Sequence, residues 1–206
     1  MRNLHFLLIF FSINLTQPHN TEQQITLYPH RDSNNDWRIY NSTIDGTADP
    51  YDWENNPLEY IKADMRIKFR HIATEKHLHS HDHRPPVSEV DFQNEVSAYG
   101  MAGFVGDSND DWFVEIEHGD SRDKESTKRL RTLRTKFRLR HALTGCYLFS
   151  HKVKLPEWGF EQQEVTCNKN AIRANSLWII ETALHPKRLF VHLPKLTLSL
   201  NFDWFN

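Results

Sequence analysis

An all-β fold, a β-trefoil made of three related units, is predicted for this 206-residue chain by two observations. The first is an internal repeat, in which "RIKFRHIATEKHLHSH" (Arg66 to His81) aligns with "KFRLRHALTGCYLFSH" (Lys136 to His151). The second is that the matched segments are short, alternate in polarity or are rich in β-branched and aromatic residues, and are separated by turn-forming residues. Repeated units of about 70 residues with four strands each favour a trefoil over a propeller, for which three blades are too few.

The first unit is incomplete. "QQITLYPHRDSNNDWRIY" (Gln23 to Tyr40) repeats only the later half of the pattern, and the apolar run "LHFLLIFFSINL" (Leu4 to Leu15) stands where the opening strands belong. This run is too short to span a bilayer, and its position is typical of a signal-peptide core. A buried strand of the domain is the alternative. Glycosylation sequons at Asn14 and Asn41 favour the secretory interpretation.

The second and third units each supply a complete set of strands. The pairs that match are Asn94 to Gly100 with Gln163 to Lys169, and Asn109 to Glu115 with Asn175 to Glu181. After them, "LTLSLNFDW" (Leu196 to Trp204) alternates apolar and polar residues and predicts a half-buried strand. We expect this strand to pack against the remnant of the first unit, near Ile25 and Trp37, as a substitute for its missing part; the alternative is that both ends of the chain add nothing to the fold.

These patterns predict three segments with different roles. Residues 1–18 are signal-like, residues 19–186 form the trefoil, and residues 187–206 form a tail with a possible extra strand. The repeats within the trefoil are expected at about 19–45, 60–118 and 130–184.

The stretch "HLHSHDH" (His77 to His83) places four histidines at alternate positions, which first suggests a metal site. Ligands spread along one flat strand cannot share a tetrahedral ion without help from elsewhere. In the third unit, Tyr147 and Phe149 take the places of the first two histidines. We therefore predict no metal ligands and no cofactor.

Two acidic turns, "DSNND" (Asp32 to Asp36) and "DSNDD" (Asp107 to Asp111), resemble the opening of a calcium loop. That loop requires glycine at its sixth position and glutamate at its twelfth. Trp37 and Trp112 occupy the sixth position instead. Turns that lead into Trp-headed strands are the better interpretation.

Composition excludes several function classes. A net charge of −2 gives no general attraction to nucleic acid. The basic run Lys128 to His141 alternates with apolar residues in the manner of an outer strand face, and no aromatic residues interleave on that face for base stacking. Nucleic-acid binding is not expected. The sequence contains no nucleophile elbow, phosphate loop or dinucleotide fingerprint.

The motifs together resemble the MIR domain of the protein O-mannosyltransferases, and most closely its second subfamily. The resemblance extends from about Thr21 to Pro186 and rests on "HLHSHDHRPPVS", "QNEVSAYG", "GDSNDDW", "LPEWGFEQQEVTC" and "NSLWIIE". It implies a β-trefoil of MIR motifs in the lumen of the endoplasmic reticulum. It also implies a parent glycosyltransferase that moves mannose from dolichyl-phosphate mannose to Ser or Thr of proteins.

The family's catalytic aspartate–glutamate pair lies in an earlier lumenal loop, and its donor site lies among membrane helices; neither matches a segment of this sequence. Whether the chain is itself an enzyme stays open. The expected role is to bind a protein acceptor or glycan, beside a mannosyltransferase membrane core or partner subunit. Two alternatives stay open: a free-standing secretory MIR protein of the stromal-cell-derived-factor-2 type that acts with chaperones, and a gene fragment with no separate role.

We expect weak carbohydrate or glycopeptide binding at the edges of the repeats. The candidates are His79, His81 and Arg84 in one repeat, with His151 and Gln163 in the other, because imidazole, guanidinium and amide groups suit the hydroxyls of sugars. The alternative is that they only hydrogen-bond turn backbones.

Since the lumen is oxidising, we also expect Cys146 and Cys167, on adjacent strands of the third repeat, to form a disulfide. The second repeat has no cysteines at the matching positions, so the fold itself does not require one.

Overall fold

The structure is a computed structural model that describes residues 4–10, 22–30, 32–44, 59–88, 93–183 and 198–204. The strands are β1 (Leu4–Phe10), β2 (Gln23–Tyr28), β3 (Trp37–Asn41), β4 (Arg66–His71), β5 (His77–Ser80), β6 (Gln93–Tyr99), β7 (Trp112–Gly119), β8 (Thr135–His141), β9 (Tyr147–Lys154), β10 (Gln163–Asn168), β11 (Ile179–Ala183) and β12 (Leu198–Trp204). Short 3-10 turns lie between them: η1 (Ser33–Asn35), η2 (Ser108–Asp110), η3 (Lys124–Thr127), η4 (Glu157–Gly159) and η5 (Arg173–Ser176).

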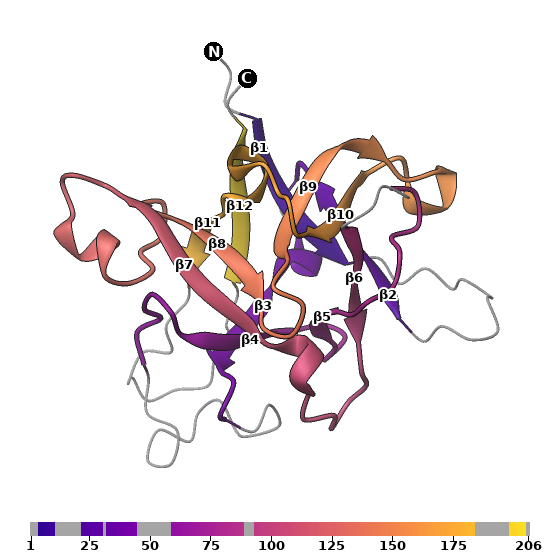
Figure 1. Cartoon of the computed structure of the whole chain (residues 1–206), viewed down its shortest axis with the longest axis horizontal. Coiled ribbons are helices and arrows are strands. Elements are labelled where there is room, and N and C mark those ends of the chain that lie inside the picture. Colours follow the sequence, from indigo (N-terminus) through magenta and orange to yellow (C-terminus); the bar gives the residue numbers. More distant parts are fainter. Residues whose placement is uncertain are drawn as a thin grey trace.

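Two complete four-strand units are visible in Figure 1, β4 to β7 and β8 to β11. In each, the two middle strands pair as a hairpin, β5 with β6 and β9 with β10. The first and last strands also meet: β4 pairs with β7, and β8 contacts the start of β11 through the Phe137–Trp178 bridge. All twelve strands join one sheet, and the β-trefoil predicted from the repeats is confirmed.

The third strands of the three units meet one another. β2, β6 and β10 pair in all three combinations, as threefold pseudo-symmetry requires. A hydroxyl on each strand donates a hydrogen bond to a side chain at the start of another: Thr26 to Gln162, Thr166 to Gln93, and Ser97 to Glu22. Glu22 is therefore the one acidic member of this ring of three acceptors.

The incomplete first unit is closed by the C-terminal strand. β12 pairs with β1 and with β11, and β1 forms a hairpin with β2 (Figure 1). The opening strands of the two complete units pair in the same way: β4 pairs with β5 and β3, and β8 pairs with β9 and β7. β12 thus occupies the place of the missing opening strand. The segment Leu4–Phe10 forms a strand of the sheet, as in the alternative to the signal-peptide interpretation. The boundaries 1–18, 19–186 and 187–206 remain a prediction.

One tryptophan of each unit lies in the hydrophobic core. Trp37, Trp112 and Trp178 each head or precede a last strand, and all three are fully buried. The indole of Trp112 donates to the carbonyl of Leu78, and that of Trp178 donates to the carbonyl of Leu148. The same interaction thus fastens the last strand to the hairpin in both complete units.

The acidic turns are capped as the turn interpretation predicts. The Asp32 side chain accepts the backbone N–H of Asn34, and the Asp107 side chain accepts that of Asn109. A histidine then contacts the carbonyl of each turn: His71 Nε2 lies 3.1 Å from the Asn34 oxygen, and His141 Nε2 lies 2.9 Å from that of Asn109. These two histidines are therefore structural.

Cys146 and Cys167 are joined by a disulfide between the start of β9 and β10, with Cα atoms 5.3 Å apart. The sequon at Asn14 and the segment from 184 to 197 lie outside the described residues. The Asn41 side chain, in the second sequon, accepts hydrogen bonds from the Thr43 N–H and hydroxyl. Within the described part of the chain, we find no helix of the length and apolarity needed to cross a membrane.

Candidate functional site

An open groove of about 700 Å³ lies where the end of β2 meets the loop between β9 and β10. Its lining combines apolar, cationic, acidic and amide side chains: Leu27, Tyr28, Pro29, Asp32, Lys152, Lys154, Phe160, Glu161, Gln162 and Gln163. The buried Leu27 supplies apolar surface, while the two lysines are exposed at its edge. Such a mixture of apolar surface with a few polar groups is typical of small-molecule and glycan sites.

Phe160 is held outward at this groove by an unusual backbone. The turn η4 packs closely, because a Cβ on Gly159 would lie 2.4 Å from the Cβ of Leu155. The chain then leaves the turn through Phe160 and Glu161, which have φ angles of 54° and 53° in the left-handed region. Non-glycine residues in this region carry strain that is concentrated at ligand sites. The Phe160 side chain is 62 % exposed as a result.

Gln163 presents a buried acceptor beside this aromatic ring. Its amide nitrogen donates to the carbonyl of His151 at 3.0 Å, which fixes the orientation of the amide. Its Oε1 atom is buried and has no hydrogen-bond partner among the described residues. A buried acceptor without a partner costs free energy, so this atom favours a ligand that brings a hydroxyl or N–H donor.

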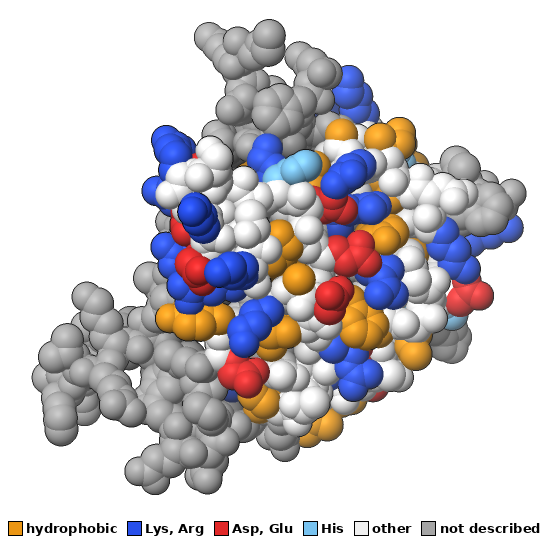
Figure 2. Space-filling view, turned by 60° about the vertical axis from the view of Figure 1, so that its left-hand side comes forward, with side chains coloured by type: hydrophobic (Ala, Val, Ile, Leu, Met, Phe, Trp, Pro, Cys, Tyr) orange, Lys and Arg blue, Asp and Glu red, His pale blue; other side chains and the backbone are white. Residues whose placement is uncertain are grey.

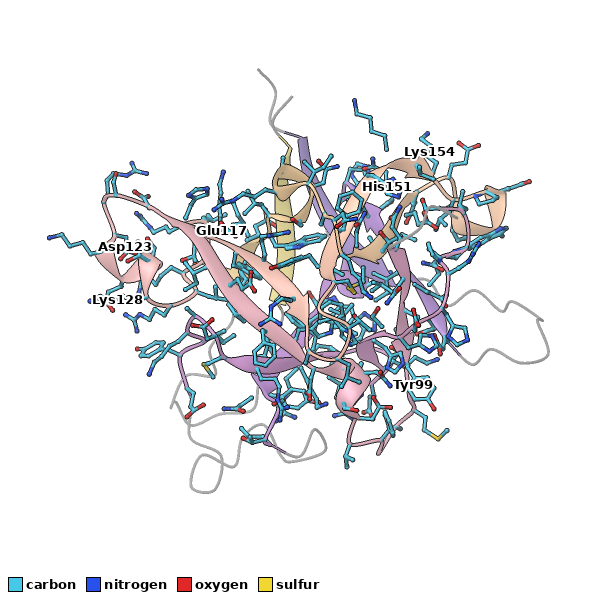
Figure 3. All side chains as sticks on the ribbon, in the orientation of Figure 1. Tyr99, Glu117, Asp123, Lys128, His151 and Lys154 are labelled. Atoms are coloured by element: carbon cyan, nitrogen blue, oxygen red, sulfur yellow. A yellow bond between two sulfur atoms is a disulfide. The ribbon has the colours of Figure 1, made fainter. Side chains whose placement is uncertain are left out.

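His151, the other third-repeat candidate, is occupied by protein contacts. Its Nε2 lies 2.9 Å from the Ser88 hydroxyl and 3.4 Å from the buried carboxylate of Glu164. Burial alone would raise the pKa of Glu164, but hydrogen bonds from His151, Ser88 and the Val87 N–H outweigh it and lower that pKa. Lys154, which lines the groove, lies on the same strand as His151 (Figure 3). His151 therefore supports the groove through its backbone carbonyl.

The second-repeat candidates lie in a different place. His79 is 4 % exposed, and its Nδ1 lies 2.8 Å from Asp110, so a sugar cannot reach it as predicted. Burial lowers the pKa of His79, but the hydrogen bond and charge of Asp110 raise it above its ordinary value. Tyr99, whose ring packs 4.8 Å from that of His79, appears well away from His151 in Figure 3. The five predicted residues thus do not form one site.

His81 and Arg84 lie at the outer end of this second cluster. The His81 Nε2 atom is 3.8 Å from Glu22 and 3.9 Å from Glu95, and the His83 ring stacks on His81 with centroids 4.1 Å apart. Burial, followed by the charge of Glu22, raises the pKa of Glu95 to about 7. The Arg84 side chain is exposed.

The basic strand faces are neutralised within the fold. Arg140 binds Glu115 at 2.7 Å, the Arg138 guanidinium lies 3.5 Å from the centre of the Tyr147 ring, and Lys68 binds Asp111 at 2.8 Å. On the face shown in Figure 2, acidic and basic side chains are interspersed. These contacts agree with the sequence interpretation that the alternation belongs to the fold.

Comparison with known proteins decides the family. The model of the MIR domain family matches residues 8–180. This chain belongs to the MIR domain family. The match includes part of β1, which the sequence analysis had left outside the trefoil.

The relatives of this MIR chain are protein O-mannosyltransferases. Dolichyl-phosphate-mannose–protein mannosyltransferase 1 of Saccharomyces cerevisiae is 49 % identical over 168 residues, which are 80 % of this chain and 20 % of the relative. The chain thus spans about a fifth of that curated relative's length. Mannosyltransferase 2 of Candida albicans is 36 % identical over 199 residues. The family resemblance is confirmed, while the higher identity with a type 1 enzyme runs against the second-subfamily assignment.

Two solved structures share this fold. The S. cerevisiae protein O-mannosyltransferase Pmt1–Pmt2 complex bound to the sugar donor matches with a TM-score of 0.71 and 44 % identity, over 88 % of this chain and 25 % of that one. The SDF2-like protein from Arabidopsis thaliana matches with a TM-score of 0.62 and 26 % identity, over 85 % and 90 %.

Several residues of the groove and of the histidine cluster were not predicted from the sequence. Phe160, Lys152 and Lys154 were not proposed, although an aromatic residue beside Gly159 in a loop is a signal of an exposed ring. Glu22 and Glu95 were also missed. They come from separate strands, and nothing local in the sequence indicates that they meet the histidines.

Proposed function

We propose that this chain is a non-catalytic MIR module of a protein O-mannosyltransferase, located on the lumenal side of the endoplasmic reticulum. The mannosyltransferase relatives and the match to the Pmt1–Pmt2 complex support this placement. Its role is to bind mannose-bearing glycans or glycopeptides of the acceptor protein. A mannosyltransferase core or partner subunit carries the catalytic step.

The groove beside Gln163 is the proposed binding site, and the unpartnered Gln163 oxygen is the observation that carries the proposal. A sugar hydroxyl is a donor of the right kind for this atom. The exposed Phe160 ring can stack on the apolar face of a pyranose, and the lysines at positions 152 and 154 can donate to other hydroxyls. His79 is left out of this site because it does not line the groove and its Nδ1 is already bonded to Asp110.

Calorimetric titration of the purified chain with a mannosylated Ser/Thr-rich peptide tests the proposal. We expect Phe160→Ala and Gln163→Leu each to weaken binding roughly tenfold, or about 1.4 kcal/mol, because each removes one kind of contact. Leu143→Ala is the matched control, since Leu143 is 59 % exposed in a turn that does not line the groove.

Absence of binding to the mannosylated peptide, or equal affinity in all three variants, would contradict this site. An Arg84→Ala variant separates the second-repeat candidate from the groove. If only Arg84→Ala weakened binding, the ligand would bind at the outer end of the histidine cluster instead.

The match to the SDF2-like protein over 90 % of its length keeps one alternative, a free-standing secretory MIR protein that acts with chaperones. Affinity purification of the tagged chain from its own cells distinguishes the two. Recovery with a mannosyltransferase subunit supports the proposed module, and recovery with chaperones alone supports the alternative.

A further inference from the structure

The cluster around His79 contains ligand atoms that converge from several strands. Glu22, His79 and His81 each place one nitrogen or oxygen atom within 4.8 Å of the others'. Glu22 precedes β2, His79 lies on β5, and His81 directly follows β5. A second carboxylate, that of Glu95 on β6, lies 3.9 Å from His81 Nε2. Histidines on one strand need ligands from other segments in order to share an ion, and Glu22 and Glu95 provide them.

His79 is oriented in the way of a metal ligand. Its Nδ1 is hydrogen-bonded to the fully buried carboxylate of Asp110 at 2.8 Å, and Tyr99 packs on the ring. When Nδ1–H donates to this carboxylate, the lone pair is on Nε2. Ligating histidines almost always donate their other N–H to a carboxylate or carbonyl, which fixes the tautomer and the direction of the ring.

His81 has a lone pair with no protein partner. Its Nε2 atom is buried and makes no hydrogen bond with the described residues. The Glu22 and Glu95 oxygens are 3.8 and 3.9 Å from it, too far for hydrogen bonds. Four ligands at about 2.0–2.1 Å from a tetrahedral zinc ion are roughly 3.4 Å apart. The Glu22, His79 and His81 atoms lie within 4.8 Å of one another, so these side chains would close around the ion, and Glu95 would join them from beside His81.

The third repeat shows that the fold does not require this cluster. There Phe149 stands at the position of His79, since the two pair with Thr166 and Ser97 respectively. Gln93 stands at the position of Glu22, because each accepts from the corresponding hydroxyl. Glu164, the counterpart of Glu95, is bound by the Val87 and Ser88 N–H groups. At the corresponding place of the third repeat, the carboxylate is therefore already bonded to backbone N–H groups, whereas the second repeat presents a set of ligands.

We propose that Glu22, His79, His81 and Glu95 form a binding site for one divalent metal ion of the zinc class. Two imidazoles with two carboxylates suit zinc and its neighbours, while calcium and magnesium prefer ligands that are all oxygen. Asp110 is a positioning residue for His79. The bound ion would join the first-repeat segment at Glu22 to the hairpin of the second repeat. This site is separate from the groove and does not depend on the proposed glycan binding.

The test is a calorimetric titration of the full chain with Zn²⁺ after removal of metals by a chelator, with melting temperature measured in parallel. We expect one zinc ion per chain and a higher melting temperature. Glu22→Gln should weaken affinity at least tenfold. This variant should fold normally, because glutamine is the acceptor at the two equivalent positions of the fold, where Gln162 accepts from Thr26 and Gln93 accepts from Thr166.

His118→Ala is the matched control, because His118 is an exposed histidine on β7. The zinc affinity of this variant should stay within twofold of that of the original chain. The d–d absorption spectrum of the Co²⁺-substituted chain gives a second readout, and we expect the intense bands of a tetrahedral site. No zinc binding, equal zinc affinity in Glu22→Gln, or Ca²⁺ binding as tight as Zn²⁺ binding would each overturn the proposal.

Discussion

At the scale of single residues, His71 and His141 each link two units of the fold. His71 Nδ1 lies 2.8 Å from the Thr74 hydroxyl, and His141 Nδ1 makes the same contact with Thr144. The other nitrogen of each ring faces a turn carbonyl and must therefore carry a hydrogen. Both rings are thus expected to be neutral, with the hydrogen on Nε2.

Stability should therefore fall in acid. Burial lowers the pKa of His71 from 6.5 to about 4, and it also lowers that of His141. The unfolded chain binds these protons first as the pH falls, so both histidines make the folded state less stable in acid. For His71, the stabilisation is complete above pH 6.5 and is lost toward pH 4. For His71 alone, the pKa shift corresponds to a loss of about 3 kcal/mol in the free energy of unfolding.

We predict that His71→Gln lowers the free energy of unfolding at pH 7 but flattens its dependence on pH between 6.5 and 4. Denaturant titrations at several pH values measure this, and His118→Ala, which changes an exposed histidine, should keep the original slope. A slope unchanged in His71→Gln would show that His71 does not titrate in this way.

At the scale of elements, β12 closes the barrel. Its residues pair with β11 on one side, Leu200 opposite Ile180, and with β1 on the other, Phe202 opposite Phe6. Without β12, both neighbours would present unpaired edges, which are prone to aggregation. The strand was expected near Ile25 and Trp37. It does contact β3, which Trp37 heads, whereas β1 lies between it and the strand that carries Ile25.

We predict that deleting Lys195 to Asn206 lowers the melting temperature by about 5 °C or more, because a whole strand of pairing is lost. Leu200→Pro should act in the same direction, since proline removes a backbone donor from the middle of the strand. An unchanged melting temperature after the deletion would mean that the C-terminal segment covers nothing.

At the scale of the whole molecule, the chain corresponds to about a fifth of a mannosyltransferase. The family resemblance implies that the catalytic acidic pair and the donor site of a mannosyltransferase lie in segments that this sequence does not match. We predict that the purified chain transfers no mannose from dolichyl-phosphate mannose to an acceptor peptide. Radiolabelled transfer, with a full-length mannosyltransferase as the positive control, measures this; product formed by the chain alone would refute the module assignment.

What the sequence by itself determined is local and periodic. The alternation in "RIKFRH" and "KFRLRH" predicts strands whose apolar residues, such as Phe69 and Phe137, are fully buried in the structure. Aligned copies also predicted the three Trp positions and the number of units. These features depend on neighbouring residues and on repetition, and both can be read directly from the sequence.

Only the tertiary structure decided which distant residues meet. Glu22 reaches His81 because β2, β6 and β10 pair around the threefold axis, and Gln163 borders a groove because β10 also meets β2. The prediction of no metal ligands considered the histidines of one strand alone and could not take account of the carboxylates of Glu22 and Glu95. β12 completes the first unit because an unpaired barrel edge is costly and an alternating strand fits it. Such contacts join residues up to two hundred positions apart, and a sequence pattern does not show which distant residues meet.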